Sequence, residues 1–344
     1  MWPVIQKTAA ARIAATLVML SVAPGAHAAA PAAALPAYDP EATSFEYPYD
    51  VQFFTFESQQ QTLRMAYLDV KPAKPNGRVV VLLHGKNFNA SDWATTIAAL
   101  TGKGFRVVAP DQIGFGKSSK PERYQFSFVQ LAANTRALLA SLGIERSAVV
   151  GHSMGGMLAT RYALGYPAAT ERLVLVNPIG LEDYGALVPP QTVDAWLARE
   201  LKQTPETVRE YQRTAYYAGA WKPEYEEHTR LPAGWTRHPE YRRVAWNSAL
   251  TYDMIFTQPV VHDFPRVRVP TLLIIGTRDR SAPGRPLAAP DVQKSMGDYT
   301  RLGKVTQQAI PGAKLVELAD VGHVPQVEAF AAFEAALVPF LAQP

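Results

Sequence analysis

The sequence predicts an α/β fold in which a mostly parallel β-sheet is covered by helices on both faces. Three observations lead to this prediction. Continuous runs of Val, Ile and Leu recur along the chain, and segments of helical periodicity separate them. A long stretch without any strand pattern interrupts the series before two further apolar runs. Continuous apolar runs are typical of strands that are buried on both faces, which is the arrangement of parallel sheets.

The expected strands and helices alternate as crossover connections in a parallel sheet require. The expected strands span 51–58, 63–70, 78–85, 105–111, 147–153, 172–178, 270–279 and 313–323. The expected helices of the same layer structure span 91–100, 128–142, 154–164 and 330–341. The first two strands are expected to form a pair.

The interruption from 181 to 264 is expected to form a helical cap, so that the core would occupy 46–180 and 265–344. Thr204 before Pro205 is a suitable helix start within it. Its expected helices are Thr192–Lys202, Pro205–Tyr217 and Arg242–Phe256. Because the stretch is inserted between two strands, it should lie over their carboxyl ends, where open α/β sheets bind ligands. It is rich in Tyr and Trp, of which most should form its own core and a minority should line a pocket.

The first 28 residues have the pattern of a secretory signal peptide. Lys7 and Arg12 precede an apolar run from Ile13 to Val22, and Ala26 to Ala28 fits the A-x-A cleavage pattern. An uncleaved membrane anchor is the alternative, which the shortness of the apolar run disfavours. We therefore expect a periplasmic or secreted protein, with 29–45 as a flexible lead-in.

Composition argues against several kinds of partner. The formal net charge of +4 is not concentrated in a long basic run, so no nucleic-acid partner is expected. No other apolar stretch reaches about 18 residues, so no stable membrane insertion is expected after signal cleavage. The chain has no cysteine, which excludes a thiol nucleophile, and no histidine spacing suits zinc. We expect a small-molecule substrate and no metal or cofactor, and the oligomeric state stays open.

The stretch Gly151-His152-Ser153-Met154-Gly155 lies between an expected strand and an expected helix. A strand that turns into a helix within one residue needs small neighbours, which the two glycines supply. The Ser153 hydroxyl is then held beyond the end of the sheet, above a helix N-terminus. The pattern therefore predicts a nucleophile, and the backbone N–H of Met154 is the natural donor to an oxyanion.

A serine nucleophile needs a histidine base and an acid that orients the base, in the chain order Ser, acid, His on such a scaffold. His323 follows the last expected strand, whereas the other histidines after Ser153 lie in or beside the insertion: His228, His238 and His262. Asp279 ends the preceding strand and is the expected acid. The rival acids are Asp320, Asp183 and Glu182.

The second oxyanion donor should come from the loop after the 78–85 strand. The backbone N–H of Lys86 is the expected donor, and Asn87 is next in line. The Lys86 side chain would either meet an anionic substrate group or be solvated. His84 is expected to brace the loop, and His152 is expected to pack beside the turn rather than act as the base.

From about Val51 to the C-terminus the chain resembles the α/β-hydrolase fold family, in its cap-bearing serine hydrolase branch. The resemblance is carried in order by "HGKN", "DQIGFGKS", "GHSMGG", "GTRD" and "GHVPQVE". It implies an eight-stranded, mostly parallel sheet, an inserted cap and a triad of Ser153, Asp279 and His323. Epoxide hydrolases and haloalkane dehalogenases, which "DQIGFGKSSKP" resembles, carry aspartate where this chain has Ser153, so serine hydrolase chemistry is favoured.

One departure from the family pattern is the separation of Asp279 and His323, which lie 44 residues apart, more than is usual. The excess, about 281–303, is rich in Pro and Gly and is expected to be a surface excursion beside the active site.

The expected function is hydrolysis of a small to medium, partly apolar carboxylic ester through an acyl-enzyme. The alternative within the fold is a C–C bond hydrolase for a diketone-type substrate, for which Arg213, Arg242 and Arg243 would supply a carboxylate clamp. Amide hydrolysis and a haloperoxidase-like side activity are further alternatives. An inactive ligand-binding protein of the same fold is the alternative of another class, and the intact Ser, Asp and His weigh against it.

Overall fold

The structure is a computed structural model that describes Met1 and residues 35–343. The predicted signal peptide, its cleavage site and residues 29–34 of the predicted lead-in lie outside the described residues. Among the helices of the described part, none is both long and apolar enough to cross a bilayer.

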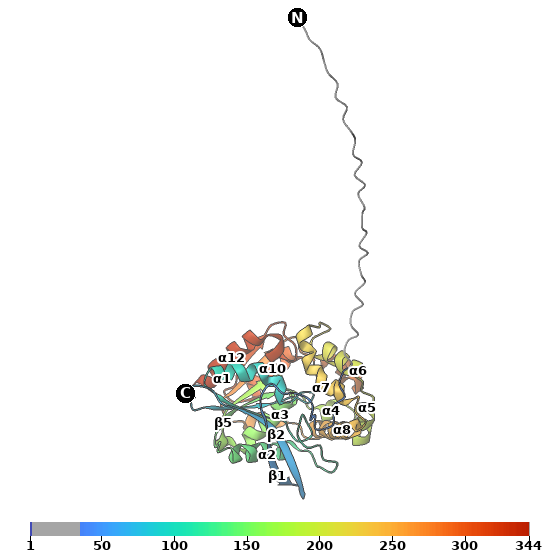
Figure 1. The fold of residues 1–344 in the computed structure, drawn as a ribbon, viewed down its shortest axis with the longest axis horizontal. Coiled ribbons are helices and arrows are strands. Elements are labelled where there is room, and N and C mark those ends of the chain that lie inside the picture. Colours follow the sequence, from blue (N-terminus) through green and yellow to red (C-terminus); the bar gives the residue numbers. More distant parts are fainter. Residues whose placement is uncertain (2–34, 344) are drawn as a thin grey trace. The chain divides into compact units, whose positions relative to one another are not determined.

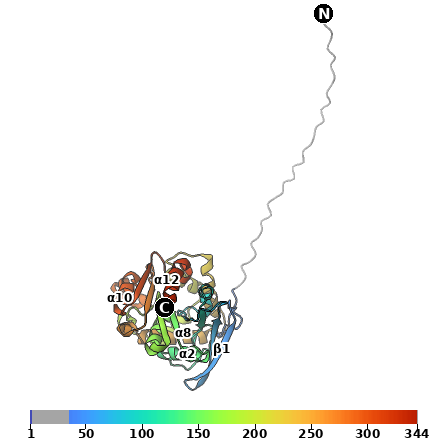
Figure 2. The ribbon, with the colours of Figure 1, turned by 90° about the vertical axis from the view of Figure 1, so that its left-hand side faces the viewer.

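The core is an eight-stranded sheet with the strand order β1-β2-β4-β3-β5-β6-β7-β8. Strand β1 pairs with β2 and β2 with β4 in antiparallel fashion, whereas all other neighbours are parallel. The strands are β1 (Val51–Ser58), β2 (Gln61–Val70), β3 (Val79–Leu83), β4 (Arg106–Pro110), β5 (Ser147–His152), β6 (Thr170–Val176), β7 (Thr271–Gly276) and β8 (Lys314–Leu318). The predicted fold class is thereby confirmed. The β1–β2 hairpin projects from the rest of the core in both views (Figures 1 and 2).

Helices cover both faces of the sheet. Every residue of β5 and β7 is therefore buried, and so is all of β3 except the half-buried Val79. One apolar core contains residues of α2 (Phe128–Ser141), α3 (Met154–Gly165) and α10 (Tyr299–Ala309). The core on the opposite face contains residues of α1 (Ala94–Gly102) and α12 (Phe330–Ala342). Two short helices complete the chain: α9 (Pro290–Ser295) follows β7 and precedes α10, and α11 (Pro325–Glu328) follows β8 and precedes α12.

The chain between β6 and β7 is helical and carries no strand, as its sequence predicts. Its helices gather on one side of the core (Figure 1). They are α4 (Tyr184–Leu187), α5 (Val193–Glu200), α6 (Pro205–Tyr211), α7 (Glu227–Trp235) and α8 (Tyr241–Thr257). A π-helical turn over Gln212–Tyr216 continues α6 directly. We call the stretch from Leu181 to Phe264 the insertion.

The expectation of a flexible lead-in is wrong for residues 38–45. Tyr38, Ala42 and Phe45 are buried and form an apolar cluster with Leu231 of the insertion. The ammonium of Lys117 donates a 2.5 Å hydrogen bond to the Ala42 carbonyl and fixes the segment to the core. The flexible lead-in was predicted from the Ala- and Pro-rich composition of the wider stretch. That composition does not show that Tyr38 and Phe45 have apolar partners elsewhere in the chain.

The expectation of a surface excursion over 281–303 holds for 284–295, most of which are half-buried or exposed, but it is wrong for the residues from Met296 onward. This stretch contains α9 and the first half of α10, and Met296, Tyr299 and Leu302 are buried in the core beside the sheet. A Cβ added to Gly303 would lie 3.2 Å from Ile275 of β7, so α10 packs closely on the sheet. The additional residues between β7 and β8 therefore build one of the covering helices.

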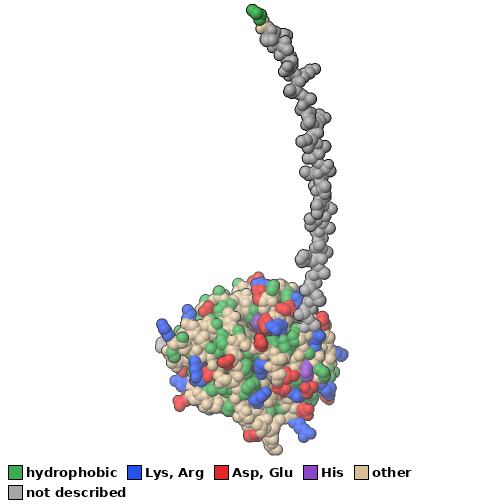
Figure 3. All heavy atoms as spheres, viewed as in Figure 1, with side chains coloured by type: hydrophobic (Ala, Val, Ile, Leu, Met, Phe, Trp, Pro, Cys, Tyr) green, Lys and Arg blue, Asp and Glu red, His purple; other side chains and the backbone are tan. Residues whose placement is uncertain are grey.

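The visible face of the molecule carries Lys and Arg side chains interspersed with Asp and Glu (Figure 3). No large area of one sign stands out on that face, as expected for a chain with a small net charge.

Candidate active site

Ser153 occupies the sharp turn between β5 and α3. Its backbone has φ 55° and ψ −120°, a region that costs free energy for a residue with a side chain. The turn is possible because a Cβ on Gly151 would lie 2.1 Å from the Gly155 carbonyl oxygen, and a Cβ on Gly155 would lie 2.1 Å from that of Leu83. Both glycines are therefore required by close backbone approach, and the strained turn presents the serine side chain at the end of the sheet.

The loops after three parallel strands bring Ser153, His323 and Asp279 together. The Oγ of Ser153 lies 2.9 Å from Nε2 of His323, and Nδ1 of His323 lies 2.7 Å from Oδ2 of Asp279. All three residues are buried, with 6%, 1% and 1% of their surface exposed. This is the arrangement in which an imidazole can take a proton from a hydroxyl while a carboxylate holds the opposite ring nitrogen.

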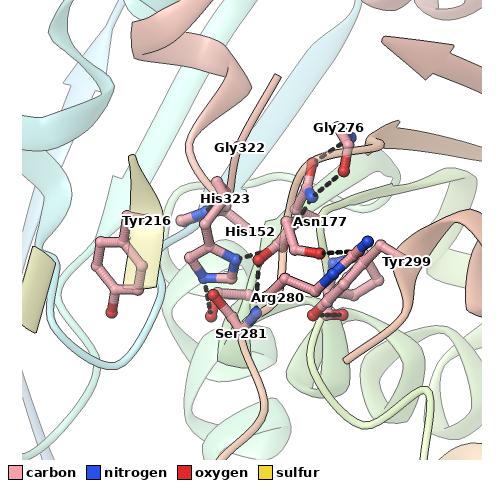
Figure 4. Close-up of polar contacts among 12 residues, drawn as sticks. His152, Asn177, Tyr216, Gly276, Arg280, Ser281, Tyr299, Gly322 and His323 are labelled. Atoms are coloured by element: carbon pink, nitrogen blue, oxygen red, sulfur yellow. Dashed lines mark hydrogen bonds and ion pairs between the residues drawn. The ribbon is translucent and has the colours of Figure 1, made fainter. Parts of the chain in front are cut away.

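Asn177 supports Asp279 and was not singled out by the sequence. Its Nδ2 donates to Oδ2 of Asp279 at 2.8 Å, and its own Oδ1 accepts from the backbone N–H of Gly276 at 2.9 Å (Figure 4). The Ser281 N–H donates to the other carboxylate oxygen at 2.7 Å. Three hydrogen bonds thus fix the carboxylate in the buried site. The sequence does indicate that Asn177 could lie near the site, because this polar residue directly follows the apolar β6. The parallel β5 ends at the same edge of the sheet, where Ser153 lies.

The backbone of His323 is held from two sides. Nε2 of His152 lies 2.8 Å from the His323 carbonyl oxygen. Burial, and the neighbouring His323, hold the pKa of His152 well below its usual value, so a neutral ring donates this hydrogen bond. On the other side, the His323 N–H donates to the Tyr216 carbonyl at 3.1 Å, and the Tyr216 ring stacks on the imidazole at 4.7 Å (Figure 4). The insertion therefore contributes directly to the placement of His323.

The two expected oxyanion donors come from different parts of the chain: Met154 directly follows Ser153, and Lys86 lies in the loop after β3. Met154 is the first residue of α3, and the loop after β3 passes so close that a Cβ on Gly85 would lie 3.0 Å from Cβ of Ser153. Within the described residues, neither the Lys86 N–H nor the Met154 N–H takes part in a hydrogen bond. Both N–H groups are thus free to donate to a ligand.

Two adjoining cavities lie between the insertion and the core. Ser153 and His323 line the smaller one, which has a volume of about 30 Å³. The larger one has a volume of about 160 Å³ and is lined mainly by residues of the insertion and of the loop from Lys86 to Asn89. Both cavities share four lining residues: Lys86, Asn87, Tyr211 and Tyr252. Trp235, Tyr241 and Tyr252 make the larger cavity partly aromatic, whereas many other insertion aromatics pack elsewhere.

The rival residues serve other contacts. The Asp320 side chain is exposed and pairs with Arg278, Asp183 pairs with His262, and Glu182 accepts from the Gly297 N–H. His84 accepts from the Gln112 N–H at 3.0 Å and braces its loop, as the sequence indicates.

The suggested arginine clamp is wrong, because neither cavity is lined by any of the three arginines. Arg213 pairs with Glu210, Arg243 pairs with Glu41 of the segment before β1, and Arg242 is exposed.

A largely buried contact between His228 and Asp92 fastens the insertion to the core. Nδ1 of His228 in α7 lies 2.5 Å from Oδ1 of Asp92, and both side chains are 11% exposed. Burial alone lowers the pKa of His228, but the hydrogen bond to Asp92 and its charge outweigh this effect and raise the pKa above its usual value.

We expect this pair to make stability depend on pH. A raised pKa in the folded state means that the stabilisation is fully present below the unfolded pKa of about 6.5 and is lost as the pH rises through the folded value. His228→Gln should therefore lower the free energy of unfolding by about 1–2 kcal/mol at pH 6 and by less at pH 9. Urea denaturation at both pH values measures the difference. His262→Gln is the matched control, since His262 also pairs with an aspartate but is 68% exposed, and it should show no such trend. An equal effect of His228→Gln at both pH values contradicts the expectation.

Comparison with known proteins gives a consistent family assignment. The profile of the alpha/beta hydrolase family matches residues 80–336. A solved structure of a probable hydrolytic enzyme from Pseudomonas aeruginosa PAO1 is 53% identical, covers 90% of this chain and 99% of that one, and superposes with a TM-score of 0.89.

Curated relatives are more distant. A 2-hydroxy-6-oxononadienedioate/2-hydroxy-6-oxononatrienedioate hydrolase of Paraburkholderia phymatum is 30% identical over 64% of this chain and 76% of its own length. An uncharacterized protein of Mycobacterium tuberculosis is 36% identical over 39% of this chain. The match spans only 36% of that relative's length.

Proposed function

The chain belongs to the alpha/beta hydrolase family, and on this premise we propose that it is an exported serine hydrolase. It cleaves a carboxylic ester of a small to medium, partly apolar substrate through an acyl-enzyme. The observation that carries the proposal is the buried chain of hydrogen bonds from Ser153 through His323 to Asp279 at the wall of a cavity.

In the acylation step, Oγ of Ser153 attacks the ester carbonyl carbon while Nε2 of His323 takes the hydroxyl proton. Asp279 accepts from Nδ1–H, so it keeps the ring in the required tautomer and stabilises the imidazolium. The oxygen of the tetrahedral intermediate receives hydrogen bonds from the Lys86 and Met154 N–H groups. The ester C–O bond then breaks, and the leaving alcohol takes the proton from Nε2.

In the deacylation step, a water molecule attacks the acyl carbon and gives a proton to Nε2 of His323. The second tetrahedral intermediate collapses, its bond to Oγ breaks, and the proton returns from Nε2 to Ser153. The products are a carboxylic acid and the free enzyme. The same two backbone N–H groups serve both intermediates, because both place negative charge on the same oxygen.

A C–C bond hydrolase is the second candidate. It is favoured by the 30% identity to the dioate hydrolase of Paraburkholderia phymatum. The three arginines that were expected to bind the carboxylate of such a substrate line neither cavity. A haloperoxidase-like side reaction is supported by a putative non-heme chloroperoxidase of Synechocystis sp., which is 27% identical over 68% of this chain and 84% of its own length. No contact of the site separately supports amide hydrolysis.

The proposal is tested with a fluorophosphonate probe and a substrate panel. The probe should label the wild-type protein and should not label Ser153→Ala, because it reacts with an activated serine hydroxyl. Short-chain 4-nitrophenyl esters should be turned over faster than a diketone acid, and the reverse order would favour C–C bond cleavage. A protein that takes no label and hydrolyses no ester would be a ligand-binding member of the family.

Export rests on the sequence of residues 1–28 alone. The mass of the protein recovered from the periplasm or the medium tests it, since cleavage after Ala28 would make Ala29 the first residue. Full-length protein retained in the cytoplasm contradicts it.

A further inference from the structure

The side chain of Lys86 lies in the wall between the two cavities. Its backbone follows β3 beside Ser153, while its Nζ reaches α8 of the insertion. There Nζ donates to Oγ of Ser248 at 2.5 Å and lies 3.7 Å from the centre of the Tyr252 ring. These contacts hold the ammonium at one place on the boundary of both cavities.

No carboxylate neutralises this ammonium. Among the described residues, no acidic side chain lies within ion-pair distance of Lys86. Glu200 lines the larger cavity and favours the charged form of Lys86 without touching it, whereas burial lowers the pKa of Lys86 to about 8. The group is therefore largely protonated at pH 7. Among the described residues, Ser248 is its one hydrogen-bond acceptor, apart from the contact with the Tyr252 ring.

The other enclosed lysines differ in this respect. Lys117 donates to the Ala42 carbonyl, and Lys120 donates to the carbonyls of Gly116 and Ser118. Both amines are occupied by backbone oxygens, and neither lysine lines the two cavities. A cation withdrawn from water costs free energy unless it is paired, so the half-buried ammonium of Lys86 at the cavity wall indicates a ligand of opposite charge.

We propose that the substrate carries a carboxylate, separated by several bonds from the scissile ester, which pairs with the ammonium of Lys86. The proposal rests on the proposed ester hydrolysis and names its substrate class. One ammonium pairs with one carboxylate, and Glu200 in the same cavity would repel a doubly charged phosphate more strongly than a singly charged carboxylate. The donors on Lys86 are divided between two tasks: its backbone N–H serves the oxyanion and its side chain serves the distant carboxylate.

Matched ester pairs that differ in charge test the proposal. One pair is 4-nitrophenyl hydrogen glutarate and its neutral methyl ester, with the charge on the acyl side. The other is 4-acetoxybenzoate and its methyl ester, with the charge on the alcohol side. The wild type should prefer the anion in one pair about tenfold or more in kcat/KM, and that pair identifies the side on which the carboxylate lies.

Lys86→Met should bring this ratio close to one. The ratio is the readout because any damage to folding or to the oxyanion donors affects both esters of a pair alike. Lys222→Met removes a charge from the exposed surface of the insertion and should leave the ratio unchanged. A wild-type ratio near one in both pairs, or a ratio that survives Lys86→Met, overturns the proposal.

A binding measurement separates this proposal from the proposed function. Calorimetric titration of the Ser153→Ala protein with monomethyl glutarate should show binding that Lys86→Met, added to it, weakens about tenfold. If this holds while the wild type takes no fluorophosphonate label, the anion site stands and ester hydrolysis falls. If labelling and neutral ester turnover occur but no Lys86-dependent binding is found, the anion site falls alone.

Discussion

His323→Ala is expected to lower kcat for a short-chain 4-nitrophenyl ester by about 10⁶-fold, measured under saturating substrate. Without the imidazole, no base among the described residues lies within hydrogen-bond distance of the Ser153 hydroxyl, and an unassisted hydroxyl is a poor nucleophile. The neighbouring His152 does not replace it, since its Nε2 is occupied by the His323 carbonyl oxygen. The alanine keeps the backbone N–H that donates to Tyr216, so the loop retains its tie to the insertion.

His262→Ala is the control for this loss. His262 lies in the insertion, is exposed and lines neither cavity, so its removal should change kcat less than twofold. The thermal unfolding of both variants shows whether they are folded. A folded His323→Ala protein that retains more than about a hundredth of the wild-type kcat would remove His323 from the role of base.

Asp279→Asn is expected to lower kcat by about 10⁴-fold. The two oxygens of Asp279 accept hydrogen bonds from His323, Asn177 and Ser281, and an amide cannot accept all three. If the new NH₂ group faces His323, the imidazole takes the wrong tautomer and its Nε2 can no longer accept a proton. If the NH₂ group faces the Ser281 N–H instead, two donors oppose each other and the imidazolium still loses its counter-charge.

Asp320→Asn makes the same chemical change three residues before His323 and serves as the control. The Asp320 side chain is 85% exposed and its partner is Arg278, so kcat should stay within about twofold of the wild type. Equal losses in the two variants, measured by steady-state kinetics with one ester, would show that Asp279 does not orient the base.

The positions of the strands along the chain and the turn at Ser153 could be predicted because local sequence determines them. Uninterrupted apolar runs specify buried parallel strands, and paired glycines specify a turn that larger residues cannot make. The same reasoning placed His323 and Asp279 beyond strand ends, and the structure brings both to Ser153. Their catalytic roles stay predictions until they are tested.

The contributions of Tyr216, α10 and residues 38–45 could not be predicted, because they depend on long-range packing. Tyr216 lies in a segment with helical periodicity, and nothing local distinguishes it from the other aromatic residues of the insertion. The helix α10 was not predicted, because a Pro- and Gly-rich stretch precedes it. The burial of its Tyr299 and Leu302 depends on packing against the distant β7. Such positions become visible only when the partner across the fold is known.

The hydrogen bond from the His323 peptide to the Tyr216 carbonyl makes the placement of His323 depend on the placement of the insertion. A rigid swing of the insertion away from the core would remove this acceptor together with the ring that covers the imidazole. With the insertion away from the core, His323 would lose the contacts that place it beside Ser153, so only the form with the insertion in place would react. Substrates that enter by displacing single side chains would then be hydrolysed. Bulky substrates that require the whole insertion to move would meet a His323 without its contacts to Tyr216. The protein would select by size before any chemistry begins.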